Sequence, residues 1–350
     1  MMMIRNLIIL LAVVTTSSIL LVTFLINPIG QISQQQYVSA QENTTVSSYN
    51  KTSTNASFFP QIHNYTSSAP GPVNSWIIES NNGVVVIDTQ RQLSEGKKVL
   101  DEIKKIKKPI LGVIITHPHP DHINGAEALL NETANVPIYS TQSTFDIMKN
   151  DTGGLIALSK QFLPRNDYSD QTVLPNKVVK SDGNITIDGI TYSFEDIGPG
   201  EAGDMTLIYL PSQKILFTGD VINNRMHPFL AEGHSSDWIK QIEHIRQNYS
   251  DAKILFPGHG QSGLSKTLLD EQLNYINTFR SLVEQQMQPV AEEKGGGGEE
   301  RAANITEEGK TRIKNELQRL YPNYMPVATL SNMLDINIDA VAKEITQDNQ

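Results

Sequence analysis

The sequence predicts an α+β fold whose two halves follow the same order, several strands and then a helix. Apolar, β-branched segments at 73–79 and 83–89 precede an amphipathic segment in the first half. Strand-like segments at 184–196 and 205–218 precede another amphipathic segment in the second half. A chain of 350 residues, 39% of them hydrophobic, can hold one domain of roughly 200–250 residues plus extra segments.

The first half begins with a predicted hairpin and continues through a central buried strand. Asn81-Asn82-Gly83 joins the first two strand segments and is typical of a hairpin turn. Ser94 is expected to cap a helix whose apolar residues recur at helical spacing. The apolar segment 111–115 has the composition of a strand that is buried on both faces. A helix at 125–130 and a short strand at 136–140 follow.

The second half begins with another predicted hairpin. Asp188-Gly189 separates the strand segments 184–187 and 190–196, and an Asp-Gly pair favours a two-residue turn. Residues 141–180, between the halves, predict a helix and a loop that can cover a site. The remaining elements are predicted strands at 205–210, 214–218 and 253–256, and predicted helices at 237–247 and 265–286.

Four candidate metal ligands follow the central strand within six residues: His117, His119, Asp121 and His122. Three of the eight histidines of the chain lie in this stretch. Open α/β sheets place their sites at the carboxyl ends of strands, where this loop falls. Alternate residues of an extended loop point the same way, so His117 and His119 can share one metal. Asp121 and His122 begin the next helix and can hold a second metal, and such ligands suit zinc or non-haem iron.

Composition limits the chemistry and the partners of such a site. The chain has no cysteine, so thiolate ligands and a cysteine nucleophile are excluded. The net charge of −10 argues against nucleic acid as a partner. The Gly-x-Ser-x-Gly motif of serine hydrolases is also absent from the sequence. Gly198-x-Gly200-x-x-Gly203 matches a dinucleotide-binding fingerprint, but a strand pattern follows it where that fingerprint needs a helix.

The amino terminus has the features of a membrane or export signal. Arg5 precedes a mostly apolar stretch at 7–26 that is long enough to span a bilayer as a helix. The next positive charge is Lys51, and this bias places the rest of the chain outside the cytoplasm. Val38-Ser39-Ala40 looks like a cleavage site, so the stretch is an uncleaved anchor or a signal peptide. We expect a protein that is membrane-anchored and faces outward, or is secreted.

Nine Asn-x-Ser/Thr triplets fit an exported glycoprotein, although an Asn- and Thr-rich composition also produces such triplets by chance. They begin at Asn43, Asn50, Asn55, Asn64, Asn131, Asn150, Asn184, Asn248 and Asn304.

The pattern His-x-His-x-Asp-His at 117–122 resembles the metal-binding motif of the metallo-β-lactamase superfamily. Further segments resemble that family's opening strands, its bridging-carboxylate motif and its final-histidine motif. They are Asn74-Ser75-Trp76, Val86-Ile87-Asp88-Thr89, Phe217-Thr218-Gly219-Asp220 and Phe256-Pro257-Gly258-His259-Gly260. The resemblance spans residues 70–265 and implies a four-layer αββα sandwich with the site along one edge of its two sheets.

The resemblance implies metal ligands at His117, His119, Asp121, His122, Asp220 and His259. Most members carry a further histidine after a Gly-Pro-Gly-like turn, where this chain has Glu201. The alkylsulfatase branch has a glutamate ligand at that place, followed by alanine as in Glu201-Ala202. We therefore expect Glu201 to be a ligand of the first metal. The alternative is a solvent-facing glutamate with only one metal bound.

A site of this kind implies a metal-dependent hydrolase acting on a small-molecule substrate. We expect one or two zinc ions, with iron or manganese as alternatives, and a shared water of lowered pKa. The resulting hydroxide attacks an ester, lactone, thioester, amide or sulfate ester, and Asp121 orients it. Two other functions remain open: an oxidoreductase with one iron on the same fold, and a non-catalytic metal-binding surface protein. The sequence names no substrate, since residues 141–180 and 222–236 carry no readable motif.

The segments of the chain follow from these features. We expect a signal anchor or signal peptide at 1–26, a disordered polar stalk at 27–57, a metallo-β-lactamase-like domain at 58–290, a Gly-rich linker at 291–304 and a helical tail at 305–350. The tail can cap the site or form a dimer contact, and the sequence does not give the oligomeric state. The remaining histidines, which are expected at the surface, are His63, His227, His234 and His244. Of these, His227 and His234 follow Asp220 closely enough to reach a substrate.

Overall fold

The computed structural model describes residues 9–15, 18–24, 59–68, 71–131, 133, 135–287, 305–328 and 330–348. The chain divides into two compact units, Met1–Asn55 and Ala56–Gln350. In the first unit, strand β1 (Ile9–Thr15) pairs with strand β2 (Ser18–Phe24) in an antiparallel hairpin. The second unit contains the sheets and helices that carry the candidate site.

The helix predicted at 7–26 is not what the structure shows, because β1 and β2 occupy this stretch. Both segments are rich in β-branched residues, as in Val13-Val14-Thr15, and such residues favour extended backbone. Among the described helices, none combines the length and the apolar character needed to cross a membrane. The predicted stalk at 27–57 and linker at 291–304 lie outside the described residues.

The first of two six-stranded sheets comes from the first half of the domain. Its strands are β3 (Gln61–Thr66), β4 (Asn74–Glu79), β5 (Val84–Ile87), β6 (Ile110–Ile114), β7 (Ile138–Ser140) and β8 (Lys177–Val178), in that spatial order. The pairs β3–β4 and β4–β5 are antiparallel, and those from β5 to β8 are parallel. The central β6 is the apolar strand that precedes the histidine-rich loop.

The second sheet comes from the second half of the domain. Its spatial order is β15 (Gly263–Leu264), β14 (Ile254–His259), β12 (Ile215–Asn223), β11 (Thr206–Leu210), β10 (Ile190–Asp196) and β9 (Gly183–Ile187). Only β12 and β14 are parallel in this sheet. The Asp188-Gly189 turn between β9 and β10 has positive φ at both residues, +46° and +81°, as a two-residue hairpin requires.

Helices occupy the connections and the carboxy terminus. They are α1 (Leu93–Ile106), α2 (Pro120–Ile123), α3 (Ala126–Leu130), α4 (Gln142–Asn150), α5 (Leu155–Ser159), α6 (Ser235–Asn248), α7 (Ser265–Gln286), α8 (Glu307–Leu320) and α9 (Met333–Asp348). The N-cap of α1 is Gln92, so the prediction of Ser94 as the cap is wrong. Ser94 instead donates its N–H and its hydroxyl to Asp167.

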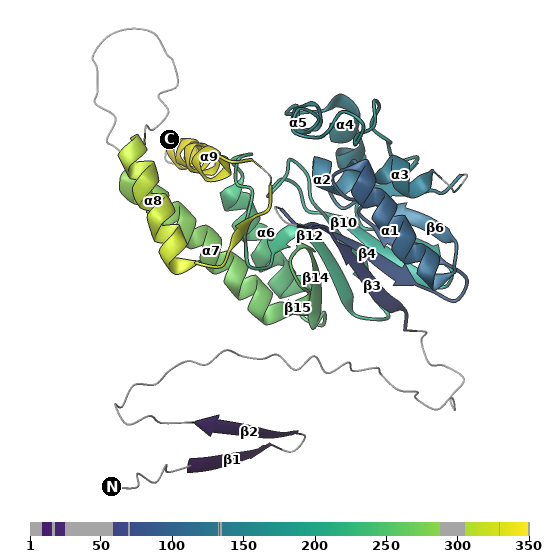
Figure 1. Cartoon of the computed structure of the whole chain (residues 1–350), viewed down its shortest axis with the longest axis horizontal. Coiled ribbons are helices and arrows are strands. Elements are labelled where there is room, and N and C mark those ends of the chain that lie inside the picture. The colour runs from purple at the N-terminus through teal and green to yellow at the C-terminus, as the bar shows by residue number, and fades with distance from the viewer. Residues whose placement is uncertain are drawn as a thin grey trace, which may run out of the picture. The chain divides into compact units, whose positions relative to one another are not determined.

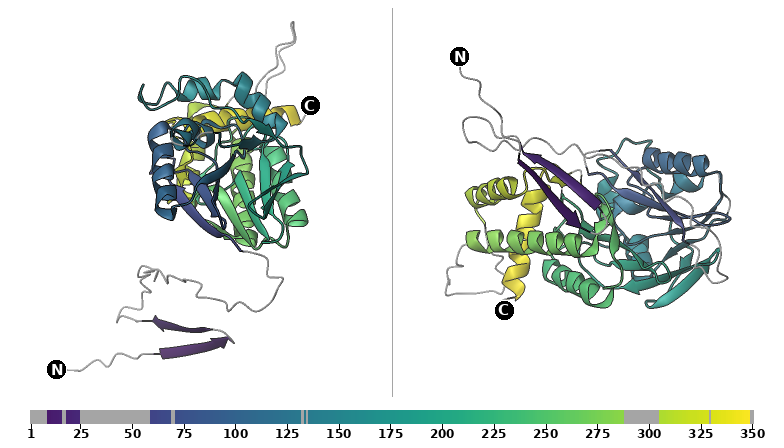
Figure 2. Two further views of the ribbon diagram at one scale, coloured as in Figure 1. Left: turned by 90° about the vertical axis from the view of Figure 1, so that its right-hand side faces the viewer. Right: turned by 90° about the horizontal axis from the view of Figure 1, so that it is seen from below.

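The two sheets pack face to face, and helices cover both outer faces (Figures 1 and 2). Trp76 and Ile87 of the first sheet share a buried cluster with Phe217 of the second sheet. Neighbouring residues on the same strands, Ile77 and Val86, point the other way and pack under α1. This period-two alternation produces the helix–sheet–sheet–helix sandwich that the resemblance implied.

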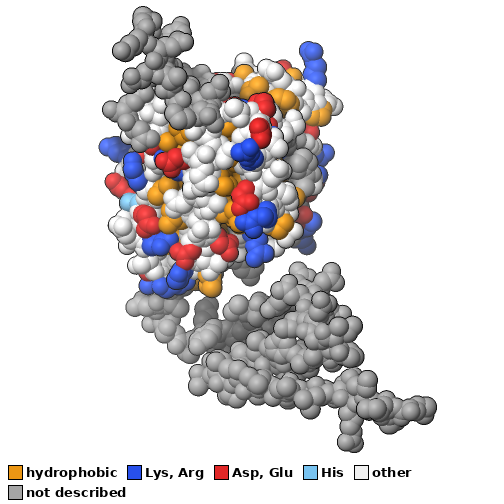
Figure 3. Space-filling model, turned by 90° about the vertical axis from the view of Figure 1, so that its left-hand side faces the viewer, with side chains coloured by type: hydrophobic (Ala, Val, Ile, Leu, Met, Phe, Trp, Pro, Cys, Tyr) orange, Lys and Arg blue, Asp and Glu red, His pale blue; other side chains and the backbone are white. Residues whose placement is uncertain are grey.

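The outer face of the second sheet is covered by helices from two regions of the chain. Leu216 of β12 shares one buried cluster with Trp238 of α6, Phe279 of α7, Leu317 of α8 and Val341 of α9. The carboxy-terminal segment also adds strand β16 (Met325–Pro326), parallel to β13 (Met226–His227). Acidic and basic side chains are intermixed on the face over α7 and α8 (Figure 3). The carboxy-terminal helices therefore pack directly on the half of the sandwich that follows residue 180.

Candidate metal centre

The predicted metal ligands come from both sheets and meet at one edge of the sandwich. The first sheet contributes four: His117 and His119 from the loop after β6, and Asp121 and His122 from α2. The second sheet contributes Glu201 from the loop between β10 and β11, Asp220 from β12 and His259 from the end of β14. The N–H of Thr206 also donates to the carbonyl of Thr116 over 2.9 Å and joins the two halves here.

His117, His119 and Glu201 form a first group, whose candidate ligand atoms all lie within 4.8 Å of one another. Glu201 Oε2 lies 2.7 Å from His119 Nδ1 and 3.7 Å from His117 Nε2. Glu201 is only 1% exposed, which excludes the solvent-facing position considered from the sequence. The structure thus brings the Glu201 carboxylate beside His117 and His119, as a ligand of the same metal ion would have to lie.

The turn that presents Glu201 is held by α6. Gln241 Nε2 of that helix donates to the carbonyls of Gly198 and Pro199, each over 2.9 Å. Gly198 has φ +72°, a conformation that glycine adopts without strain. A Cβ on Gly200 would lie 2.1 Å from Gln241 Oε1, so a larger residue there would displace the side chain that holds the turn. Both glycines therefore favour the observed turn.

Asp121, His122 and His259 form a second group, again with candidate ligand atoms within 4.8 Å of one another. Asp220 lies against this group, with its two oxygens 3.3 Å from His122 Nε2 and 3.0 Å from His259 Nε2. A Cβ on Gly258 would lie 1.8 Å from Asp220 Oδ1. The glycine before His259 is therefore needed for Asp220 to reach its place.

Each of the four histidines is held through one ring nitrogen, which leaves the other nitrogen facing the centre. This arrangement fixes the ring orientation and is typical of metal-binding histidines. The held atoms and their partners are His117 Nδ1 with Thr116 Oγ1 (2.9 Å), His119 Nε2 with Glu232 Oε1 (2.6 Å), His122 Nδ1 with Asp88 Oδ2 (2.9 Å) and His259 Nδ1 with the carbonyl of Pro72 (2.5 Å).

Several inward-facing atoms of these groups are buried and make no directed hydrogen bond, and their nearest polar neighbours are one another. They are His117 Nε2, His122 Nε2, Glu201 Oε2, Asp220 Oδ1 and His259 Nε2. A buried polar atom without a partner costs free energy, and protein folds rarely tolerate several in one place. Nitrogen and oxygen atoms that converge in this way suit a divalent cation.

The buried carboxylates differ in their preferred charge state because their neighbours differ. Burial raises the pKa of Glu201 to about 8, against the opposing influence of His119. Burial also opposes ionisation of Asp220, but His259 and His122 outweigh it and hold its pKa well below the ordinary value. The same two histidines overcome burial at Asp121 and lower its pKa as well. A cation beside Glu201 would therefore stabilise the ionised form of its carboxylate, which burial disfavours.

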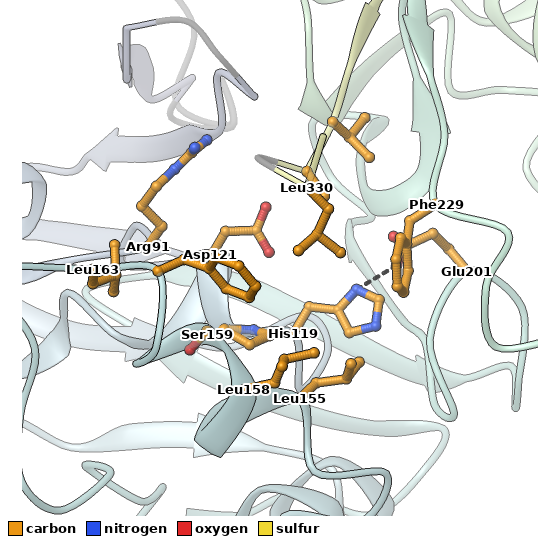
Figure 4. Close-up of a pocket in the computed structure, with 14 residues that line it drawn as sticks. Arg91, His119, Asp121, Leu155, Leu158, Ser159, Leu163, Glu201, Phe229 and Leu330 are labelled. Carbon is orange, nitrogen blue, oxygen red and sulfur yellow. Dashed lines mark ion pairs between the residues drawn. The ribbon is translucent and has the colours of Figure 1, made fainter. Parts of the chain in front are cut away.

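A pocket opens onto this centre (Figure 4). Its residues include the candidate ligands His119, Asp121 and Glu201, and Arg91 lies on the Asp121 side. Much of the remaining lining is apolar, and part of it comes from the segment at 141–180 that was expected to cover the site. The lining also includes Val327, Ala328 and Leu330 from the carboxy-terminal segment.

Several residues of the site were not identified from the sequence. Asp88 could have been noticed as an acidic residue that directly follows a buried strand. Glu232 and Leu330 had no local signal, because they approach the centre only through tertiary packing. The prediction of a surface position for His227 is wrong, since this residue is 5% exposed. Its Nδ1 lies 2.7 Å from the hydroxyl of Tyr275.

Comparison with known proteins identifies the family. The family model described as the metallo-beta-lactamase superfamily matches residues 68–259. This chain belongs to the metallo-beta-lactamase superfamily. The match confirms the resemblance inferred from 117–122.

Two kinds of curated relative are similar to this chain. A linear primary-alkylsulfatase of a Pseudomonas species is 25% identical over 56% of this chain and 43% of its own length. A metallo-beta-lactamase type 2 of Bacillus cereus is 25% identical over 57% of this chain and 71% of its own length. The chain thus spans less than half of the alkylsulfatase. Among solved structures, a metallo-beta-lactamase from Pontibacter korlensis matches with a TM-score of 0.50 and 25% identity, covering 62% of this chain and 94% of that one.

Proposed function

We propose that this protein is a hydrolase that uses two divalent metal ions, with zinc as the first candidate. The observation that carries the proposal is the convergence of buried imidazole nitrogens and carboxylate oxygens that face one another without a directed hydrogen bond. These atoms are the zinc ligands available to a chain without cysteine. Among the described residues, three groups of candidate ligands overlap here, and two of them, His117–His119–Glu201 and Asp121–His122–His259, share no residue, which supports a pair of ions rather than one.

The two groups suggest which residues hold each ion. His117, His119 and Glu201 would hold the first ion, and Asp121, His122 and His259 the second. We propose that Asp220 would serve both ions, since its oxygens lie 3.3 and 3.0 Å from His122 and His259 of the second group and, in addition to burial, its charge raises the pKa of Glu201 in the first. Manganese or iron would accept the same set of nitrogen and oxygen ligands.

Asp121 is the candidate ligand best placed to take part in the reaction. Bound divalent ions supply Lewis-acid polarisation of the scissile group and lower the pKa of the attacking water. The Asp121 side chain is 24% exposed, more than the other six candidate ligands, and it lines the pocket. Its low pKa keeps it ionised, so it can accept a hydrogen bond from the water and orient it. Hydrolysis then joins the water oxygen to the acyl carbon or sulfur, breaks the bond to the leaving group and returns the proton to that group.

The proposed substrate is a small-molecule ester, lactone, thioester, amide or sulfate ester. Alkylsulfatases and beta-lactamases among the relatives support keeping both sulfate esters and cyclic amides in this range. The deciding experiment measures hydrolysis of such a panel by the full chain after chelation and again after zinc is restored. Activity that returns with zinc in the wild type and in His244→Ala, but not in His122→Ala, supports the proposal. His244 is a suitable control because its side chain is 36% exposed and contacts Glu195 instead.

Two results, obtained when the metal content and the oxygen dependence of the same samples are also measured, would favour the other functions. A single bound iron with oxygen-dependent turnover would favour the oxidoreductase. Stable zinc binding through His117 and His119, without turnover of any member of the panel, would favour a non-catalytic metal-binding surface protein.

We also propose that the protein acts outside the cytoplasm, either anchored to the membrane or secreted. Arg5 ahead of the apolar stretch at 7–26 supports export, and so do the Asn-x-Ser/Thr triplets. Digestion of intact cells with an impermeant protease tests this proposal. Loss of the protein from intact cells, or its recovery from the medium, supports export, whereas protection until the cells are lysed contradicts it.

A further inference from the structure

The lining of the pocket over the candidate metal centre is charged on one part. His119, Asp121 and Glu201 belong to this lining, so a bond to be hydrolysed would lie next to them. Figure 4 shows His119 between Leu330 on one side and Leu155 and Leu158 on the other. The part of a substrate next to the reacting bond would therefore meet aliphatic side chains on two opposite sides.

The apolar walls come from segments that are far apart in the chain. One wall is α5 and the residues after it, with Leu155, Leu158, Phe162 and Leu163. The opposite wall consists of Phe229, Val327, Ala328 and Leu330. Binding pockets typically combine such apolar lining with a few polar groups that fix orientation, and here those polar groups are the candidate metal ligands.

The opposite wall is fixed in place by helix α9. Asn337 of α9 accepts a hydrogen bond from the N–H of Leu230 over 2.9 Å and donates to the carbonyl of Pro228 over 2.8 Å. These bonds bracket Phe229, and Val327 continues from β16, the strand paired with β13. The apolar surface on this side is therefore held by the fold.

The apolar lining continues to the outside of the molecule. Phe162 is 58% exposed and Leu158 is 37% exposed, yet both line the same pocket as the candidate ligands. A large aromatic side chain that is exposed beside a site keeps its apolar surface available for a ligand. The surface from Phe162 inward to His119 thus offers continuous contact for an extended apolar group.

We infer that the substrate carries a linear acyl or alkyl chain, which lies between the α5 wall and the Phe229–Leu330 wall. This inference rests on the proposed hydrolase function and names the substrate class of the same site. The ester, thioester or sulfate ester end of the chain lies over the candidate metal ligands, and the other end points toward Phe162. Removal of apolar surface from water is favourable, so substrate binding should strengthen with each CH2 group that the pocket walls cover.

The test is the chain-length dependence of hydrolysis by the zinc-loaded full chain. The 4-nitrophenyl esters of acetate, butyrate, hexanoate and octanoate form one series, and hexyl, octyl and decyl sulfate form the other. Complete burial of one CH2 group corresponds to roughly fourfold in kcat/KM, so a steep rise along one series is expected. The series that shows the rise distinguishes an acyl chain from an alkyl sulfate. A flat or falling dependence in both series would overturn the inference.

A double variant, Leu158→Asn with Phe162→Ser, tests whether these walls cause the dependence. Its matched control is Leu320→Asn with Phe59→Ser, which changes a leucine and a phenylalanine of similar exposure, 40% and 63%, away from the pocket. We expect the gain per CH2 group to fall to about twofold or less in the pocket variant and to persist in the control. Equal slopes in the two variants would contradict the assignment.

Calorimetric binding of octanoate and octyl sulfate separates this inference from the hydrolase proposal. Neither compound has to react. One result would separate the two proposals: no substrate is hydrolysed, one of these compounds binds, and the pocket variant weakens its binding at least fivefold relative to the control. The proposed reaction is then wrong and the chain-binding pocket stands. No difference between the pocket variant and the control in binding or in hydrolysis would remove the pocket assignment.

Discussion

Glu232 offers a sharp test of how the candidate centre is held together. Its Oε1 lies 2.6 Å from His119 Nε2, and the other ring nitrogen of His119 faces Glu201. The carboxylate therefore fixes the orientation of the ring and makes its inward nitrogen a better ligand. We expect Glu232→Gln to weaken metal binding, since the amide keeps the shape and the accepting oxygen but loses the charge.

The expected size of this effect follows from the exposure of Glu232. Loss of a carboxylate that holds a metal-binding histidine typically costs 10- to 100-fold in metal affinity. The Glu232 side chain is 25% exposed, so water screens part of its charge. We therefore expect the lower end, about tenfold in the dissociation constant, or about 1.4 kcal/mol.

Competition with a zinc-binding dye measures this affinity on the full chain. Glu195→Gln is the matched control, because Glu195 Oε1 contacts His244 Nε2 at 2.8 Å and its side chain is 23% exposed, but it lies away from the candidate ligands. The control should retain wild-type zinc affinity. Equal zinc affinities for Glu232→Gln and Glu195→Gln would refute the role assigned to Glu232.

Three further substitutions probe the site and its surroundings. Gly258→Ala should reduce bound metal at least twofold by elemental analysis, because the added Cβ would lie 1.8 Å from Asp220 Oδ1; unchanged metal content would contradict this. Asp88→Asn should lower the free energy of unfolding in urea by about 1–3 kcal/mol, since its new amide would face the donors of Thr116; an unchanged urea midpoint would contradict this. Burial raises the pKa of Asp204 to about 7, so its neutral form favours folding and stability falls as the pH rises from about 4 through 7. Asp204→Asn should flatten that fall in urea midpoints, and an identical pH profile would argue against it.

The sequence predicted the parts of the site that depend on local order. His117, His119 and Asp121 follow one buried strand, so their spacing alone brings them together. Asp220 lies within strand β12 and His259 ends strand β14, and each lies beside a glycine. Both residues were identified from the sequence motifs that contain them. The four-layer arrangement was implied by the family resemblance, whereas strand alternation and helix periodicity, which are local patterns, predicted its individual elements.

The residues of the site that the sequence did not reveal depend on tertiary packing. Glu232 contacts His119 across more than a hundred residues, and Leu330 reaches the pocket only because α9 and β16 dock on the second half. His227 is buried by Tyr275, which lies far along the chain on α7. At the amino terminus, a stretch of apolar and β-branched residues satisfies both helix and strand patterns, and the structure has the strands. Contacts between residues that lie far apart in the chain produce no periodic pattern in the sequence.

The metal content of the full chain tests the central proposal most directly. Mass spectrometry should find two zinc ions per chain in the wild type and about one in Glu201→Ala. The control Glu243→Ala, which changes a partly exposed glutamate of α6, should retain two ions. One iron per chain that is unchanged by Glu201→Ala would contradict the binuclear hydrolase and direct attention to oxygen chemistry.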